Sequence, residues 1–157
     1  MGKRRIVRPT TKGKKPMQND SRFHELPWRI RYVDTDKMGV VYYANYLAYF
    51  EAGRTEYFRA MGHTYADLEE RGVFLAVVEV HCRYRAPARY DQIIKVRTWV
   101  GRVRRTRIDF HYKVLNESGN LLADGWSTLA CLDSEGRPRP LPDEVRETLE
   151  GLVVPAK

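Results

Sequence analysis

One apolar segment of helical period, residues 43 to 61, constrains the fold of this chain more than any other feature. Its apolar side chains recur every three or four positions and form a broad face, and small residues fill the other sides. The face consists of Tyr46, Leu47, Phe50, Gly53, Tyr57, Phe58 and Met61. A helix with so little polar surface has to be covered by other elements.

The segments on either side of this helix alternate apolar and polar residues, which is typical of strands. The predicted strands are residues 24–33, 74–85, 92–103, 106–115 and 121–132. Short helices are predicted at 64–72 and 142–149. Because the last four strands are joined by short connections, we expect an antiparallel sheet. The predicted fold is therefore α+β, with a curved sheet of about five strands wrapped around the long helix.

A chain of 157 residues, 43% of them hydrophobic, favours one domain with a real core. We expect this domain at residues 23–150, between a flexible basic tail at 1–22 and a C-terminal tail at 151–157. Residues 1–20 carry seven Lys and Arg against one acid, Asp20, which is most of the net charge of +8. The folded part is therefore only mildly basic.

No apolar run approaches the roughly 20 residues that span a bilayer, and the basic N-terminus lacks the apolar region of a secretory signal. The two cysteines, Cys82 and Cys131, fall in predicted strands, where cysteine is typical as a small buried residue. These observations favour a cytoplasmic protein.

The loop before the long helix, DTDKMGVVYYANY from Asp34 to Tyr46, places two acids next to an apolar run. A calcium loop of EF-hand type is excluded, because Met38 and Asn45 stand where carboxylate ligands are needed. Helix capping explains Asp34. It explains Asp36 less well, because residues 39–41 separate this acid from the helix and let the loop fold back beside the helix start.

A carboxylate in that position can do chemistry. A helix N-terminus offers unpaired N–H groups and partial positive charge, which polarise a docked carbonyl and stabilise an oxyanion. The carboxylate can then attack the carbonyl or deprotonate a water molecule that does so. Apolar surroundings would raise the energy of such a carboxylate and make it a better base.

The stretch from Arg31 to Phe58, RYVDTDKMGVVYYANYLAYFEAGRTEYF, resembles the signature of the 4-hydroxybenzoyl-CoA thioesterase family, including its YbgC-like branch. The shared pattern is Asp-Thr-Asp, Gly-Val-Val-Tyr, Asn-Tyr and then Phe-Glu-x-x-Arg on the helix. The likeness extends in element order from about Phe23 to Leu149. It implies the hotdog fold, in which a curved antiparallel sheet wraps around a long helix.

The resemblance also implies roles for individual residues. Asp36 matches the catalytic carboxylate, and Tyr43 matches the position whose backbone N–H polarises the thioester carbonyl. Gly39 and Val40 belong to the substrate-binding loop. Asn45 and Glu51 match recurrent helix positions, which we interpret first as structural or interface residues and second as substrate-binding ones. Arg54 lies one turn beyond Glu51 and is placed to pair with it.

The chain departs from part of the family at one position. Several YbgC-like members that act on short acyl chains carry His where this chain has Tyr43. The change removes an imidazole but keeps the backbone N–H, which every residue except proline supplies. The aryl-CoA branch can also have Tyr at this point, so the thioesterase interpretation stands.

Coenzyme A carries phosphates, and the family binds them with basic residues near the turn that here reads GRVRRTRIDF. Arg104 and Arg105 match best, and the planar guanidinium suits phosphate oxygens. A solvated basic hairpin is the alternative. A second cluster, Arg83, Arg85 and Arg89, is a weaker candidate. The four histidines show no metal-ligand spacing.

We therefore expect an acyl-CoA thioesterase that hydrolyses a short-chain or aromatic acyl-CoA without a cofactor. The resemblance implies a homodimer that pairs again to a tetramer, with an acyl carrier protein as a second candidate partner. Two other functions stay open. One is a hotdog module that binds acyl-CoA or acyl carrier protein without catalysis, and the other is a nucleic-acid or membrane-surface protein acting through the basic tail.

Overall fold

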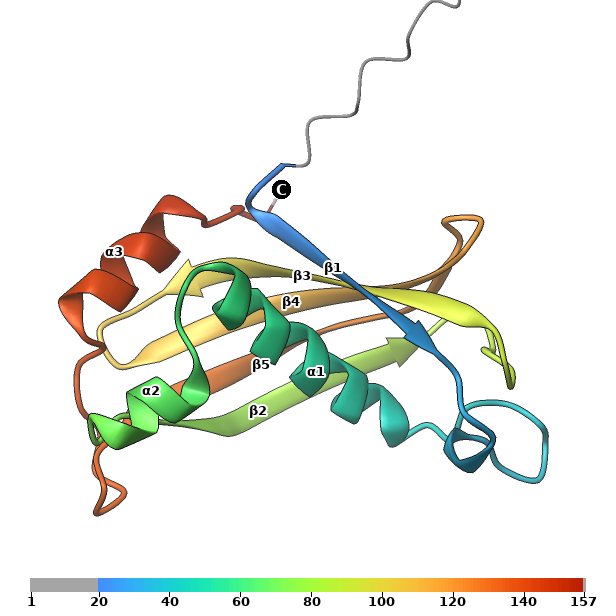
Figure 1. Cartoon of the computed structure of the whole chain (residues 1–157), viewed down its shortest axis with the longest axis horizontal. Coiled ribbons are helices and arrows are strands. Elements are labelled where there is room, and N and C mark those ends of the chain that lie inside the picture. Colours follow the sequence, from blue (N-terminus) through green and yellow to red (C-terminus); the bar gives the residue numbers. More distant parts are fainter. Residues whose placement is uncertain (1–19, 157) are drawn as a thin grey trace, which may run out of the picture.

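The computed structural model describes residues 20 to 156, which contain a five-stranded antiparallel sheet (Figure 1). Its strands are β1 (Phe23–Arg29), β2 (Phe74–Tyr84), β3 (Ile93–Val103), β4 (Arg107–Asn116) and β5 (Leu121–Leu132). They follow the order β1-β3-β4-β5-β2, so β1 and β2 form the two edges. The predicted α+β fold is confirmed.

One long helix, α1 (Asn45–Ala60), lies across one face of this sheet, which we call the inner face (Figure 1). A 3-10 turn, η1 (Tyr32–Asp34), follows β1. The short helix α2 (Tyr65–Glu70) precedes β2, and α3 (Asp143–Gly151) packs at the end of β3. The elements thus occur in the predicted order.

The core lies between α1 and the inner face. The buried side chains of α1 include Tyr46, Tyr49, Phe50, Tyr57 and Phe58, and those of the sheet include Val96, Val100, Phe110 and Tyr112. The rings of Phe50 and Tyr112 stack with their centroids 4.3 Å apart. Burial of one such side chain contributes about 1.5–3 kcal/mol, so this contact holds α1 on the sheet.

Gly53 sets how closely α1 approaches the sheet. A Cβ atom at this position would stand 2.6 Å from the Thr98 Oγ1 and 2.8 Å from a Val96 methyl group. Both neighbours belong to the buried centre of β3, where side chains have little room to move. Any side chain at position 53 would therefore push the helix away.

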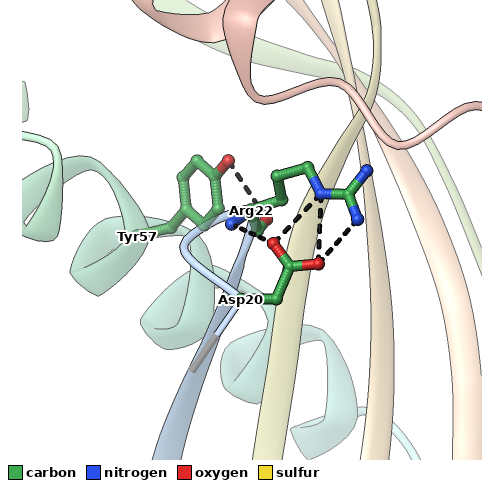
Figure 2. A network of polar contacts seen from close by, with 3 residues as sticks. All are labelled: Asp20, Arg22 and Tyr57. Carbon is green, nitrogen blue, oxygen red and sulfur yellow. Dashed lines mark hydrogen bonds and ion pairs between the residues drawn. The ribbon is translucent and has the colours of Figure 1, made fainter. Parts of the chain in front are cut away.

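The far end of α1 is tied to the start of β1. The Tyr57 hydroxyl donates to the Arg22 carbonyl oxygen at 3.4 Å, and the Arg22 guanidinium pairs with Asp20 at 2.6 Å (Figure 2). The Arg22 backbone N–H also donates to the Asp20 carboxylate at 3.1 Å. This network fixes the chain as it enters the sheet.

The first strand ends four residues before its predicted end. Alternation predicted a strand over 24–33, but β1 stops at Arg29 and the chain turns through η1. The turn forms because the Asp34 carboxylate accepts the backbone N–H of Arg31 at 3.0 Å. A side chain that captures a nearby N–H competes with a sheet hydrogen bond, and apolar alternation carries no sign of it.

Part of the inner face lies beyond the helix. The α1 helix packs mainly against β1, β3 and β4, and β2 projects past it. Val77, Val80 and Tyr84 of β2 are 48%, 40% and 47% exposed. Leu47, which the helical pattern placed in the buried face, is 41% exposed for the same reason. An open groove therefore runs between α1 and the edge strand β2.

The two predicted tails differ in what the structure describes. Most of the basic tail, residues 1–19, lies outside the described residues. The segment after α3 contacts the sheet, because the Val154 N–H donates to the Val100 carbonyl oxygen at 2.9 Å and Val153 packs against the core. None of the helices within residues 20–156 has the length and apolar character to cross a membrane.

Candidate functional site

A pocket of about 340 Å³ opens at the N-terminal end of α1. It is lined by Asp36, Met38, Val40, Val41, Tyr43, Tyr46, Tyr84, Arg85, Ala86 and Pro87. Three predicted site residues, Asp36, Val40 and Tyr43, thus share one pocket. Its walls are mostly apolar, which suits a small organic group held by a few polar contacts.

The turn of residues 36–39, which we call the Asp36 turn, presents the carboxylate. One carboxylate oxygen of Asp36 accepts the Met38 N–H at 2.8 Å, and the Gly39 N–H donates to the Asp36 carbonyl oxygen at 3.0 Å. Gly39 closes the turn with φ of +73°, a conformation that favours glycine. The second carboxylate oxygen has no hydrogen-bond partner in the described part of the chain, so it is available to a ligand.

Unused backbone donors lie at the start of α1. The Tyr42 N–H donates to the Asp34 carbonyl oxygen and the Asn45 N–H to that of Tyr42, both at 2.9 Å. Between them, the N–H groups of Tyr43 and Ala44 have no partner among residues 20–156. They carry the partial positive charge of a helix N-terminus, and Tyr43 lines the pocket that also contains Asp36.

Tyr84 fixes this helix start from the sheet. Its hydroxyl donates to the Tyr43 carbonyl oxygen at 2.9 Å, and the two rings meet edge to face with centroids 6.4 Å apart. Desolvation, together with Cys82, raises the pKa of Tyr84 to about 12, so the hydroxyl keeps its proton and remains a donor. Tyr84 was not predicted as a site residue, although alternation with Val80 and Cys82 would have placed it on one face of the strand.

Asp34 plays a different part from the one predicted. Its carboxylate does not cap α1, because it is bound by the Arg31 backbone N–H at 3.0 Å and the Arg31 guanidinium at 2.9 Å. The α1 helix is instead held by the Asp34 carbonyl oxygen, which accepts the side-chain amide of Asn45 at 2.9 Å. Burial alone would raise the pKa of Asp34, but Arg31 lowers it on balance.

Asn45, Glu51 and Arg54, the residues singled out on the helix, lie in three different environments. Asn45 supports the loop through Asp34. Glu51 is exposed and lines a second pocket further along α1. Arg54 does not pair with Glu51 but points inward, 8% exposed, and donates to the hydroxyls of Tyr65 at 2.9 Å and Tyr112 at 3.2 Å. The expected ion pair between Glu51 and Arg54 is therefore wrong.

Arg104 and Arg105 lie at the other end of the sheet from Asp36. Val103, the residue before Arg104, lies in register across β4 and β5 with Val77, near the start of β2. The site pocket adjoins Tyr84, which is the last residue of β2. Arg104 pairs with Asp109. Within one chain, the structure does not bring these arginines to the site.

Two arginines from the second predicted cluster lie nearer. Arg85 lines the site pocket and binds Asp124 at 2.8 Å. The exposed Arg89 lies beside the Asp36 turn, where its guanidinium is 3.9 Å from the place a Cβ of Gly39 would occupy. Arg89 therefore brings positive charge beside the Asp36 turn, whereas Arg85 is paired with Asp124. Both belong to the cluster that was predicted as the weaker candidate.

This arrangement can act on a carbonyl group. A carbonyl oxygen directed at the Tyr43 N–H would be polarised, and Asp36 lines the same pocket as Tyr43. In the described part of the chain, no three side chains of His, Cys, Asp or Glu lie close enough together to hold a metal ion. The groups on hand are a carboxylate, backbone donors and aromatic walls.

Comparison with known proteins identifies the family. Residues 30–149 match the family model described as the thioesterase-like superfamily. The acyl-CoA thioester hydrolase YbgC of Escherichia coli O157:H7 is 33% identical over 120 residues, which cover 76% of this chain and 90% of YbgC. The acyl-CoA thioesterase YbgC of Haemophilus influenzae is 34% identical over 129 residues, which cover 81% and 94%.

Solved structures give the same result. A DHNA-CoA thioesterase from Staphylococcus aureus superimposes with a TM-score of 0.80 at 31% identity, covering 83% of this chain and 90% of that one. The predicted hotdog fold and the prediction of an enzyme are confirmed. The chain belongs to the thioesterase-like superfamily.

Proposed function

We propose that the protein is an acyl-CoA thioesterase in which Asp36 and the Tyr43 backbone N–H carry the reaction. The thioester carbonyl oxygen accepts the Tyr43 N–H, which makes the carbonyl carbon electron-poor. Asp36 removes a proton from water as the water oxygen attacks this carbon, or its own oxygen attacks first and water releases the acyl group afterwards. The carbon–sulfur bond breaks, the thiolate takes up a proton, and the products are a carboxylic acid and free CoA.

One observation supports this proposal above the others. The pocket at the start of α1 is lined by both Asp36 and Tyr43. Among residues 20–156, one carboxylate oxygen of Asp36 and the backbone N–H of Tyr43 have no hydrogen-bond partner. A non-catalytic acyl-CoA-binding module has no need for a carboxylate beside the donor. The relatives named as acyl-CoA thioesterases support the same substrate class.

The walls of the pocket bear on the acyl group. Tyr46 and Tyr84 meet edge to face with centroids 5.3 Å apart, and Tyr43 stands beside them. Aromatic side chains offer wide apolar surfaces that suit a short aliphatic or a flat aromatic acyl group. We infer a short-chain or aromatic substrate from these walls, and the reaction requires no cofactor beyond water.

We also propose that the active assembly is a homodimer paired through β2. This edge strand exposes Val77, Val78 and Val80, and an exposed apolar edge is suited to pairing with another strand. Antiparallel pairing of two β2 strands sets the start of one beside the end of the other. Arg104 and Arg105 of the second copy then lie at the same end of the assembly as Asp36, where the CoA phosphates would meet them.

Thiol release by the purified full chain tests the enzymatic proposal. Butanoyl-, hexanoyl-, octanoyl- and benzoyl-CoA are supplied, and free CoA is followed with a thiol reagent. We expect turnover with at least one substrate. Binding of these compounds without any release of thiol contradicts the proposal and supports the non-catalytic module.

Light scattering tests the assembly. We expect the mass of a dimer or of a dimer of dimers for the native chain, and a monomer for Val78→Lys, because a charge at this edge opposes strand pairing. Glu117→Lys, in the exposed β4–β5 turn away from β2, is the matched control. A monomeric native chain contradicts the proposed dimer.

A further inference from the structure

The face of the sheet opposite α1, which we call the outer face, carries no helix within residues 20–156. The buried side chains of α1, α2 and α3, such as Phe58, Leu68 and Val145, belong to one core on the inner face. Outward positions alternate with buried ones along β3 and β4, so that Trp99 and His111 are half-buried between fully buried neighbours. An antiparallel sheet can leave such a face to solvent or to another chain.

Five rings cross the outer face in a single row, which we call the ring row. Directly paired positions on neighbouring strands carry them, in the order Phe23, Trp99, His111, Trp126 and His81. The rings of Trp99 and His111 stack 18° from parallel. Those of Trp126 and His81 stack 11° from parallel. Since these ring faces turn toward one another, they are not open to stack on nucleotide bases.

A glycine keeps the ring row close to the sheet. A Cβ atom at Gly101 would overlap the His111 ring, so the imidazole lies directly over the β3 backbone. The register between β3 and β4 shifts between Val100 and Arg102, which marks a bulge at this glycine. The outer face therefore offers a low aromatic strip that another flat surface can approach.

A hollow beside the ring row contains one unpaired acid and one unpaired base. It measures about 320 Å³ and is lined by Glu79, Arg104, Arg107, Asp109, His111, Trp126 and Thr128. Arg104 pairs with Asp109. Glu79 and Arg107 are exposed and have no ion-pair partner among residues 20–156. Free charges of opposite sign on one surface are complementary to the same surface of a second copy related by a two-fold axis.

We propose that the outer faces of two β2-paired dimers pack against each other. The ring rows lie at the centre of this contact, and Glu79 of one copy pairs with Arg107 of the opposing copy. This inference rests on the homodimer proposed above and adds the surface that joins two dimers. The site pocket stays open, because Asp36 and Tyr43 line it at the start of α1, away from the outer face.

The size of the outer face explains why dimers, and not monomers, would pack in this way. With strands about 4.8 Å apart and about 3.3 Å per residue, the five strands present roughly 600 Å² of outer face per chain. A stable interface buries about 800 Å² per partner, which is more than one chain offers. Antiparallel pairing of two β2 strands keeps both outer faces on the same side. The dimer therefore offers enough area, whereas the monomer does not.

Light scattering on a variant of the ring row tests the surface. We expect a dimer of dimers for the native chain and a dimer for Trp126→Glu, because packing would bury an unpaired carboxylate. The dissociation constant between the two forms should rise at least about a hundredfold. Thiol release should stay within about twofold, since Trp126 does not line the site pocket. A native chain that is a dimer at every concentration overturns the inference.

Charge exchange tests the contact without touching the rings, and it decides the matter where Trp126→Glu does not fold. We expect Arg107→Glu alone and Glu79→Arg alone to yield dimers, because each sets like charges opposite one another. The double variant should recover the dimer of dimers. Glu117→Lys, in the exposed β4–β5 turn, is the control and keeps the native mass. A dimer of dimers that persists in both single variants, or a double variant that stays a dimer, overturns the contact.

The outcomes separate this inference from the proposed function. A chain that forms the dimer of dimers but releases no thiol contradicts the thioesterase alone. A native dimer that hydrolyses acyl-CoA and that Val78→Lys dissociates overturns the outer-face contact alone. A native dimer whose tryptophan fluorescence is quenched by a single-stranded oligonucleotide assigns the outer face to nucleic acid and also overturns the contact.

Discussion

The two turns on either side of Thr35 differ in how much of their hydrogen-bonding capacity the protein itself uses. In the Asp34 turn, residues 31–34, both carboxylate oxygens are bound by Arg31, and the Asp34 carbonyl oxygen accepts from Tyr42 and Asn45. In the Asp36 turn, one carboxylate oxygen accepts the Met38 N–H and the other has no partner in the described chain. The first acid is buried, whereas the second lines a pocket.

One short loop thus serves both stability and chemistry. Groups whose hydrogen bonds are satisfied internally hold the backbone in place. A group left partly unsatisfied beside a pocket remains available to a ligand. The Asp34 turn therefore fixes the start of α1, and the Asp36 turn presents a free oxygen beside it.

Asp36→Asn should abolish most of the activity and leave the stability nearly unchanged. We expect thiol release to fall by about a thousandfold, because the amide is neither base nor nucleophile. The free energy of unfolding should change by less than about 0.5 kcal/mol, since the amide oxygen can still accept the Met38 N–H. Steady-state kinetics and urea unfolding measure the two effects. Near-native turnover would exclude Asp36 from the chemistry.

Asp34→Asn should lower the stability of the protein and leave most of its activity. We expect a loss of about 1–2 kcal/mol in the free energy of unfolding, because the variant weakens the bonds from Arg31 and the guanidinium is exposed and partly screened. Urea unfolding measures the loss. Activity should fall far less than in Asp36→Asn. A stable Asp34→Asn protein without activity would show that the two roles were assigned the wrong way round.

Tyr84→Phe removes one support of the helix start and leaves both acids intact. The lost hydrogen bond to the Tyr43 carbonyl oxygen predicts a fall in kcat of roughly twofold to tenfold. KM for the same acyl-CoA should change less, because the pocket wall keeps its ring. A KM effect with unchanged kcat would assign Tyr84 to substrate binding alone.

Lowering the pH should remove part of the stability that the Asp34 carboxylate contributes, and this effect is the smallest expected here. Arg31 lowers the pKa of Asp34 below its ordinary value of 3.8, so the folded state favours the charged carboxylate. Its stabilisation is present above that value and is lost as the pH falls through the folded pKa. The difference in unfolding free energy between native protein and Asp34→Asn should therefore shrink below about pH 4. A difference independent of pH would contradict the ion pair.

The sequence pattern predicted those parts of the fold that depend on local signals along the chain. Strand β5 has the predicted bounds, because the turn of residues 116–120 marks its start and Asp133 follows its last apolar residue, Leu132. The end of β1 was wrong, because a side chain of Asp34 captures a backbone N–H. Leu47 was expected in the core, yet its helical position gives no sign that β2 extends past α1.

The site was predictable in part for a different reason. The position of Asp36 in its loop already indicated chemistry, whereas the role of Tyr43 came from the resemblance to a family. Both residues line one pocket in the structure. Tyr84 was missed, because its contact with Tyr43 joins residues 41 positions apart and depends on tertiary packing. The contacts of Arg54 with Tyr65 and Tyr112 were not predicted either, because helical spacing favoured a pair with Glu51.

The structure of the Asp36→Asn variant with a bound acyl-CoA tests the central claim most directly. The account predicts a thioester carbonyl oxygen about 2.7–3.1 Å from the Tyr43 backbone nitrogen, with the side chain at position 36 facing the carbonyl carbon. A thioester bound in the pocket with its carbonyl directed away from the start of α1 would contradict it.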